Sequence, residues 1–211
     1  MSENRWDDSP YVLGVTGGLC SGKSTVSKIL REKGAAVIDA DALAHDLLLP
    51  DSRVFDDVIS EFSPDILDEH GHVDRARLAE LVFSSEQDRK RLESIVHPAV
   101  VDEIETKLNK FARNDVHVAV LDVPLLYEAG LDEMCDQVWV VYCEPEQQKA
   151  RARKRDGLSE AEAVRRMDAQ IRLDVKAERA DKIIDNSGSI SQLHDEVQHS
   201  WHQLQQTLTG R

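Results

Sequence analysis

The sequence has few of the residues that mark secreted or membrane-spanning proteins. Its three cysteines, Cys20, Cys135 and Cys143, are an odd number without C-x-x-C spacing, which argues against a disulfide framework and against a structural zinc site. It contains no run of about eighteen apolar residues, so a transmembrane helix is excluded. The polar residues 1–10 lack the apolar stretch of a secretory signal. We therefore expect a cytoplasmic protein with reduced thiols and no membrane partner.

Positive charge is also scarce. The chain of 211 residues has 26 Lys and Arg against 40 Asp and Glu, a formal net charge of −14 at pH 7. Such a field repels polyanions, so we expect no nucleic-acid partner, and a phosphate-bearing ligand needs a local basic pocket. The simpler interpretation of the acidity is a solvated surface that favours solubility. The length fits one compact domain, with room for a small inserted subdomain.

One local motif indicates nucleotide binding. Residues 17–24, GGLCSGKS, match G-x-x-x-x-G-K-[ST] between an apolar run at 11–16 and a helical pattern at 23–33. Small residues there let backbone N–H groups surround phosphates at a helix N-terminus. Lys23 is suited to the β and γ phosphates of ATP and the Ser24 hydroxyl to Mg²⁺. The loop residues assigned to nucleotide binding are Gly18, Leu19, Cys20, Ser21, Gly22, Lys23, Ser24 and Thr25; Thr25 either supports the α phosphate or only begins the helix.

Carboxylates end two of the predicted strands. Asp39 and Asp41 follow the run at 36–38, at the strand end where open α/β sheets bind ligands. Either one of them accepts a proton from an attacking hydroxyl, or one caps the helix beginning near Ala42. Asp122 closes the run at 116–121 and is suited to support Mg²⁺ through water, opposite Ser24, or else it is a turn carboxylate before Pro124.

A basic cluster stands out in this acidic chain. Arg151, Arg153, Lys154 and Arg155 lie on one predicted helix, and Arg151 and Arg155, four residues apart, share a face. Guanidinium groups delivered to a transferred phosphoryl group would neutralise its developing charge. The alternative is an ordinary solvated helix face. RNA binding is disfavoured by the net charge and by the lack of interleaved aromatics.

The order of the elements predicts an α/β fold with a parallel sheet covered on both faces. Further short apolar runs lie at 138–142 and 183–184, and residues 190–208 form a closing helix pattern. About seventy residues between the second and third runs repeat helically, and we expect His97-Pro98 to start a long helix to about Phe111. The predicted organisation is an N-terminal extension at 1–10 and a domain at 11–211, with a helical insertion at about 45–113 and a lid region at about 145–180.

Together these segments resemble the dephospho-CoA kinase family over nearly the whole chain. The resemblance rests on GVTGGLCSGKSTV at 14–26, VIDADALAH at 37–45, VDRARLAELVF at 73–83, VHP at 96–98, VPLLYE at 123–128, RARKRD at 151–156, RMDAQ at 166–170 and IIDNSGS at 183–189. Each of the later segments alone is weak evidence for the family, whereas their order and spacing together are specific to it. The resemblance implies a parallel-sheet P-loop kinase fold with an inserted helical substrate-binding subdomain and a lid helix.

The resemblance also implies a reaction. ATP would give its γ-phosphoryl group to the 3′-hydroxyl of the ribose of dephospho-CoA, with Mg²⁺, in the last step of coenzyme A biosynthesis. Asp41 would be the base, Lys23 and Arg151 would stabilise the transition state, and Arg155 would act in the lid. Asn186 and Gly188 would lie near the adenine. Motif positions assigned to the acceptor side are Asp41, His45, Arg75, His97, Leu126 and Glu128. We expect a monomer or a weak homo-oligomer.

The sequence departs from the family pattern at Cys20, where relatives usually carry Gly. Either the cysteine is tolerated, or it is a redox-sensitive thiol whose pKa is lowered by backbone donors and Lys23. His45, where relatives often have Arg, is a milder departure. The alternative functions are another small-molecule kinase of the same fold, such as a nucleoside monophosphate kinase, and a nucleotide-hydrolysing switch; an N-K-x-D guanine motif is absent.

Overall fold

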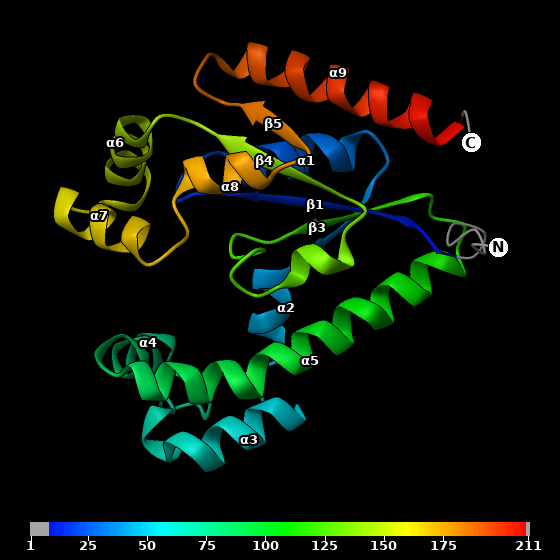
Figure 1. Ribbon diagram of the computed structural model, residues 1–211. Helices are drawn as coiled ribbons and strands as arrows, with labels where there is room; N and C mark the ends of the chain where they lie inside the picture. Colours follow the sequence, from blue (N-terminus) through cyan, green and yellow to red (C-terminus); the bar gives the residue numbers. More distant parts are fainter. Residues whose placement is uncertain (1–8, 210–211) are drawn as a thin grey trace. The chain divides into compact units, whose positions relative to one another are not determined.

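The computed structural model describes residues 9–209, except the side chain of Phe83, and these residues form two compact units (Figure 1). Of the described residues, 9–38 and 111–209 form the sheet unit, and Asp39–Lys110 form the helical unit. Of the predicted extension at 1–10, residues 1–8 lie outside the described part. Within residues 9–209, no helix has both the length and the apolar character that a membrane crossing requires.

A sheet of strand order β2-β3-β1-β4-β5 organises the sheet unit. β1 pairs in parallel with β3 and β4, and β4 pairs in parallel with β5. The central strands are apolar on both faces, which is typical of strands covered by helices on two sides. The α/β fold is therefore as predicted. The strand bounds are Tyr11–Gly17 for β1, Ala36–Asp39 for β2, Val118–Asp122 for β3, Gln137–Tyr142 for β4 and Lys182–Asp185 for β5.

Helices α1 and α9 lie together on the sheet. Val26 and Ile29 of α1 and Val197 and Trp201 of α9 belong to one buried cluster with residues of β1, β3, β4 and β5. This packing fixes α1, and with it the loop between β1 and α1. The helices of the sheet unit are α1 (Lys23–Glu32), the 3₁₀ turn η2 (Leu131–Met134), α6 (Pro145–Asp156), α7 (Glu160–Asp168), α8 (Leu173–Arg179) and α9 (Ile190–Thr209).

The helical unit has a core of its own. Val54 and Val58 of α3, Ile66 of η1, and Val73 and Leu78 at α4 are buried together, and partly buried apolar residues of α5 pack against them. Its elements are α2 (Ala40–Asp46), α3 (Arg53–Phe62), η1 (Pro64–Ile66), α4 (Arg75–Ser84) and α5 (Glu86–Ala112).

The predicted helix start at His97-Pro98 is wrong. α5 is continuous from Glu86 to Ala112 and contains Pro98 in its interior. A proline there removes one backbone hydrogen bond and usually ends a helix. Here Leu92, Ile95, Val96 and Ala99, on both sides of the proline, pack against the same core, so tertiary packing maintains the helix through this position.

Candidate active site

The phosphate-binding loop joins β1 to α1 without a capping side chain. Gly22 is the N-cap of α1 with φ 102°, and no side chain caps the helix. This left-handed backbone conformation suits glycine. The first N–H groups of α1 are consequently not satisfied by a side-chain oxygen, and such groups bind anions. The geometry is that of a phosphate site.

Two loop glycines are required because polar side chains approach the backbone closely. A Cβ at Gly18 would lie 2.6 Å from Gln148 Oε1, and a Cβ at Gly22 would lie 2.0 Å from Asn186 Nδ2. Gln148 is on α6 and Asn186 follows β5. Both side chains are almost fully buried. The loop is therefore held from elements far along the chain.

Lys23 and Asp122 form an ion pair next to this loop. Lys23 Nζ donates to Asp122 Oδ1, and the side chains are 16% and 6% exposed. Asp122 ends β3, in register with Val15 of β1. The Ser24 side chain, one residue after Lys23, is exposed. Two predicted site residues, from segments 99 residues apart, are thus brought into contact.

Arg151 and Asn186 bind the backbone of the loop. Asn186 Nδ2 donates to Ser21 O at 2.7 Å, and Arg151 donates to the same oxygen at 3.4 Å and to Asn186 O at 2.7 Å. Ser21 itself is buried, and no hydrogen-bond partner of its hydroxyl is found within the described residues. The two residues therefore position the loop, whatever further contact they make with a nucleotide.

Cys20 differs from the prediction in its chemistry. Burial raises the pKa of its thiol, and the nearby Arg155 only partly opposes this. Arg155 binds both carboxylate oxygens of Asp156, at 2.7 and 2.8 Å, and the Cys20 thiol donates to the same carboxylate at 3.6 Å. The neighbouring charges thus largely cancel, and Lys23 is paired with Asp122. The predicted lowering of the Cys20 pKa is wrong.

The acceptor-side candidates Asp39 and Asp41 are distinguished by helix α2. Asp39 is its N-cap and accepts a hydrogen bond from Ala42 N at 3.0 Å. Asp41 lies in the first turn of α2 and is exposed. Of the two alternatives left open by the sequence, capping belongs to Asp39, and Asp41 remains the candidate base.

His45 and Arg75 line one cavity of the helical unit. Its volume is about 250 Å³, and its other lining residues are Leu48, Leu49, His72 and Val73. His45 is one turn beyond Asp41 on α2, so the two side chains share a face of that helix. A cavity lined by three apolar side chains, two histidines and an arginine suits a ligand that has both apolar and anionic parts.

The other three acceptor candidates lie elsewhere. His97 is exposed on α5 and does not line this cavity. Leu126 is fully buried, so direct contact with a substrate is not supported. Glu128 Oε1 binds Lys176 Nζ at 2.8 Å and the N–H of Ile171 at 2.8 Å. Leu126 and Glu128 are therefore engaged within the protein.

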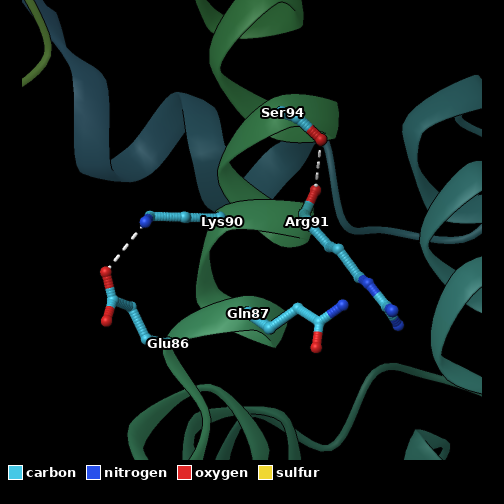
Figure 2. A pocket seen from close by; sticks show the side chains of 5 residues that line it. All are labelled: Glu86, Gln87, Lys90, Arg91 and Ser94. Atoms are coloured by element: carbon cyan, nitrogen blue, oxygen red, sulfur yellow. Dashed lines mark hydrogen bonds and ion pairs between the residues drawn. The ribbon is translucent and has the colours of Figure 1, made fainter.

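A second hollow of the helical unit is lined by one helix alone. Figure 2 shows its residues, Glu86, Gln87, Lys90, Arg91 and Ser94 of α5. Lys90 is paired with Glu86 at 2.8 Å, and Arg91 with Glu61 of α3 at 3.4 Å. Because both cations have carboxylate partners, we assign no ligand to this surface.

Some residues of the site were not found from the sequence. Gln148 and Lys176 are buried, but a polar residue within a predicted helix is usually exposed. Gly18 and Gly22 were noted for the loop, whereas the residues that approach them gave no local signal.

These observations define the class of the protein. A parallel sheet, a glycine loop leading into a helix N-terminus, a loop lysine paired with the carboxylate that ends β3, and a basic helix bound to the loop are the parts of a phosphate-loop kinase. A family model described as dephospho-CoA kinase matches residues 11–192. The chain belongs to the dephospho-CoA kinase family.

Individual relatives agree with this assignment. A dephospho-CoA kinase of Symbiobacterium thermophilum is 50% identical over 190 residues, which cover 90% of this chain and 80% of the relative. A crystal structure from Thermus thermophilus has a TM-score of 0.80 at 32% identity, covering 93% of this chain and 98% of that one. The structure of a dephospho-CoA kinase from Campylobacter jejuni has a TM-score of 0.69 at 29% identity, with 92% and 96% covered.

Proposed function

We propose that this protein transfers the γ-phosphoryl group of ATP to the 3′-hydroxyl of dephospho-CoA, giving CoA and ADP. The observation that supports it most is the assembled nucleotide loop, with Lys23 and Asp122 in contact and Arg151 and Asn186 on its backbone, in a member of this family. In the transfer, the acceptor oxygen bonds to the γ phosphorus, the bond from that phosphorus to the bridging oxygen breaks, and the hydroxyl proton passes to a base.

On the ATP side we assign charge stabilisation to the loop and the basic helix. When ATP binds, the Lys23 ammonium would leave Asp122 and pair with the β and γ phosphates, which carry more negative charge. Arg151, already at the loop, and Arg155 would compensate the charge that spreads over the transferred group. Asn186 and Gly188, which follow β5, would border the adenine.

Mg²⁺ fits the residues present. The exposed Ser24 hydroxyl and the Asp122 carboxylate are hard oxygen donors of the kind that Mg²⁺ prefers. When bound with ATP, the ion would neutralise phosphate charge. Ser24 and Asp122 would hold it, Asp122 being released from Lys23 when the phosphates attract that ammonium group.

On the acceptor side we propose Asp41 as the base and the cavity of about 250 Å³ as part of the substrate site. Arg75 and His45 would bind the diphosphate of dephospho-CoA, and Leu48 and Leu49 would contact its apolar arm. His97 remains a further candidate for this side. We also propose that the helical insertion at about 45–113 is the substrate-binding subdomain and that the region at about 145–180 is the lid. The proposed location of the protein is the cytoplasm.

The test is the release of ADP with ATP and Mg²⁺, alone and with dephospho-CoA, adenosine or AMP. We expect stimulation by dephospho-CoA with equimolar formation of CoA. Stimulation only by adenosine or AMP would identify a different small-molecule kinase, and release without any acceptor would identify a hydrolase.

Replacing Asp41 by Asn tests the base. We expect retained ATP binding and turnover lowered by roughly a hundredfold or more, as is usual for loss of a general base. Asp46→Asn, which removes the same charge from the other end of α2, is the matched control and should keep near-normal turnover. An Asp41→Asn protein with full turnover would assign the base elsewhere.

A further inference from the structure

Lys176 of α8 is a buried cation that the proposed reaction does not use. Its side chain is 0% exposed. The ammonium donates to the carbonyl oxygen of Pro124 at 2.8 Å and to Glu128 Oε1 at 2.8 Å. Glu128 Oε1 also accepts the N–H of Ile171 at 2.8 Å. One ammonium group therefore connects α8, the loop after β3 and the segment that follows α7.

A buried lysine at this position is unfavourable for the stability of the fold if its only role is packing. Removing an ammonium from water costs several kcal/mol, and an apolar residue of similar volume is often as stable or more so than a buried ion pair. Burial lowers the pKa of Lys176, against the opposing effect of Glu128. What an apolar side chain would not provide is the pair of hydrogen bonds to Pro124 and Glu128.

Those bonds end at the nucleotide site. Pro124 lies two residues after Asp122, the partner of Lys23, and its carbonyl also accepts the Thr16 hydroxyl at 3.1 Å. Thr16 is completely buried and directly precedes the glycine loop. Lys176 and Thr16 together therefore fix the turn that carries Asp122 relative to β1.

The same helix touches the loop itself. Leu173, three residues before Lys176 and thus on the same face of α8, has its Cδ2 at 3.4 Å from the position of a Cβ at Gly18. Leu173 and Lys176 are both buried. A change in how α8 is seated would consequently reach Gly18 through Leu173 and Asp122 through Pro124.

We propose that Lys176 is a positioning residue of the nucleotide site, holding the turn after Asp122 through Pro124 and the segment after α7 through Glu128. It does not contact the reacting atoms. Glu128 serves as its counter-ion and as the acceptor for Ile171, in place of the substrate contact suggested by the sequence. The inference rests on the proposed phosphoryl transfer.

The test compares Lys176→Met with the double variant Lys176→Met/Glu128→Met. The single change leaves a carboxylate and a carbonyl without their partner, so we expect a lower urea midpoint. The double change removes both charges and should recover much of that loss. We expect kcat to stay at least tenfold below normal in both variants, with the KM for dephospho-CoA within threefold. All rates are measured at a temperature where near-UV circular dichroism shows each variant folded.

Lys182→Met is the matched control, because Lys182 pairs with Glu196 at 3.7 Å in the same unit, with 32% of its side chain exposed. It should change neither midpoint nor kcat appreciably. A double variant with normal kcat, whatever its stability, would show that Lys176 does not position the nucleotide site and would overturn the proposal.

Binding of ATP with Mg²⁺, measured by calorimetry, separates this proposal from the proposed reaction. We expect both variants to bind ATP at least fivefold more weakly, because Lys23, Asp122 and Gly18 are displaced. If the unaltered protein fails to phosphorylate dephospho-CoA, the reaction is wrong, and Lys176 is still judged by ATP affinity. If the double variant does not fold, Glu128→Ala, which removes the acceptor of both hydrogen bonds, is the substitute: unchanged ATP affinity and unchanged kcat there contradict the proposal.

Discussion

Cys20 is held in a backbone conformation that cysteine adopts reluctantly. Its φ is 52°, in the left-handed region that costs a residue with a Cβ about 1–2 kcal/mol. Glycine would relieve this backbone strain, but glycine loses more conformational entropy on folding, which costs about 0.5–1 kcal/mol of stability. The two effects are similar in size, so a cysteine at this position costs the fold little compared with a glycine.

We therefore predict that Cys20→Gly leaves the free energy of unfolding nearly unchanged, whereas Cys20→Val lowers it by about 1–2 kcal/mol, because a β-branched residue is a worse fit to positive φ. Urea unfolding of the two variants measures the difference. The glycine variant should also keep its turnover. A glycine variant without activity would show that the thiol has a role in the reaction.

Tyr127 makes stability depend on alkaline pH. Burial raises its pKa to about 12 from 10.0. As pH rises above 10, the unfolded chain loses the phenolic proton while the folded protein keeps it, so stability is lost between about pH 10 and 12. The hydroxyl is buried, and no partner for it is found among the described residues.

We predict that Tyr127→Phe removes part of this loss. The phenyl ring still packs beneath Arg179, whose guanidinium lies 4.0 Å from the ring centre, and no buried hydroxyl is left unpaired. At pH 7 the variant should be as stable as the normal protein, and at pH 11.5 more stable by on the order of 1–2 kcal/mol. Parallel pH dependences of the two unfolding midpoints would contradict the assignment.

At the scale of elements, α5 contains the clearest conflict between local preference and packing. Pro98 interrupts the hydrogen bonding of a continuous helix, at a usual cost of about 3 kcal/mol. We predict that Pro98→Ala raises the free energy of unfolding by about 1–3 kcal/mol, measured in urea. An unchanged or lower value would mean that the helix breaks at this proline in solution, as the sequence suggests.

The elements of the sheet unit were predictable because their signals are local. The five apolar runs and the closing helix lie within two residues of the observed bounds, since buried parallel strands are continuously apolar. The start of α5 was not predictable from proline alone. The apolar residues on both sides of Pro98 share one core, and a prediction from neighbouring residues in the sequence does not include such tertiary contacts.

At the scale of the whole molecule, one part of the candidate site was predictable from the sequence and another part was not. The loop residues were predictable because the motif is contiguous. The supports of the loop were not, because Asn186 reaches Ser21 across 165 residues and Lys176 reaches Pro124 across 52. The predicted lowering of the Cys20 pKa failed for a related reason: burial raises this pKa, and Asp156 opposes the lowering effect of Arg155. Both the burial and these neighbours arise only in the folded chain.

Because the nucleotide site is built by the folded state, ATP should stabilise the whole protein. We predict an increase in the free energy of unfolding of about 2.7 kcal/mol at a hundredfold excess of ATP over its Kd, seen as a higher thermal midpoint. Lys23→Met should abolish the shift and lower stability without ligand by about 3 kcal/mol, because the buried Asp122 loses its partner.

Lys28→Met is the matched control for that experiment. Lys28 lies on the same helix and pairs with Glu32 at 3.9 Å on the surface, with 73% of its side chain exposed. It should change neither the thermal midpoint nor the shift with ATP. A Lys23→Met protein with a normal ATP shift would contradict the assignment of the loop.

The amide of Asn186 beneath Gly22 and Ser21 has a consequence for the order of events during protein synthesis. The glycine loop is among the first parts of this sequence to leave the ribosome, but its support follows β5. The nascent chain therefore cannot complete a nucleotide site until residues beyond Asn186 have been translated. A ribosome stalled before that point would present β1, the loop and α1 without the amide that holds the Ser21 carbonyl, although the helical unit Asp39–Lys110 would already be translated.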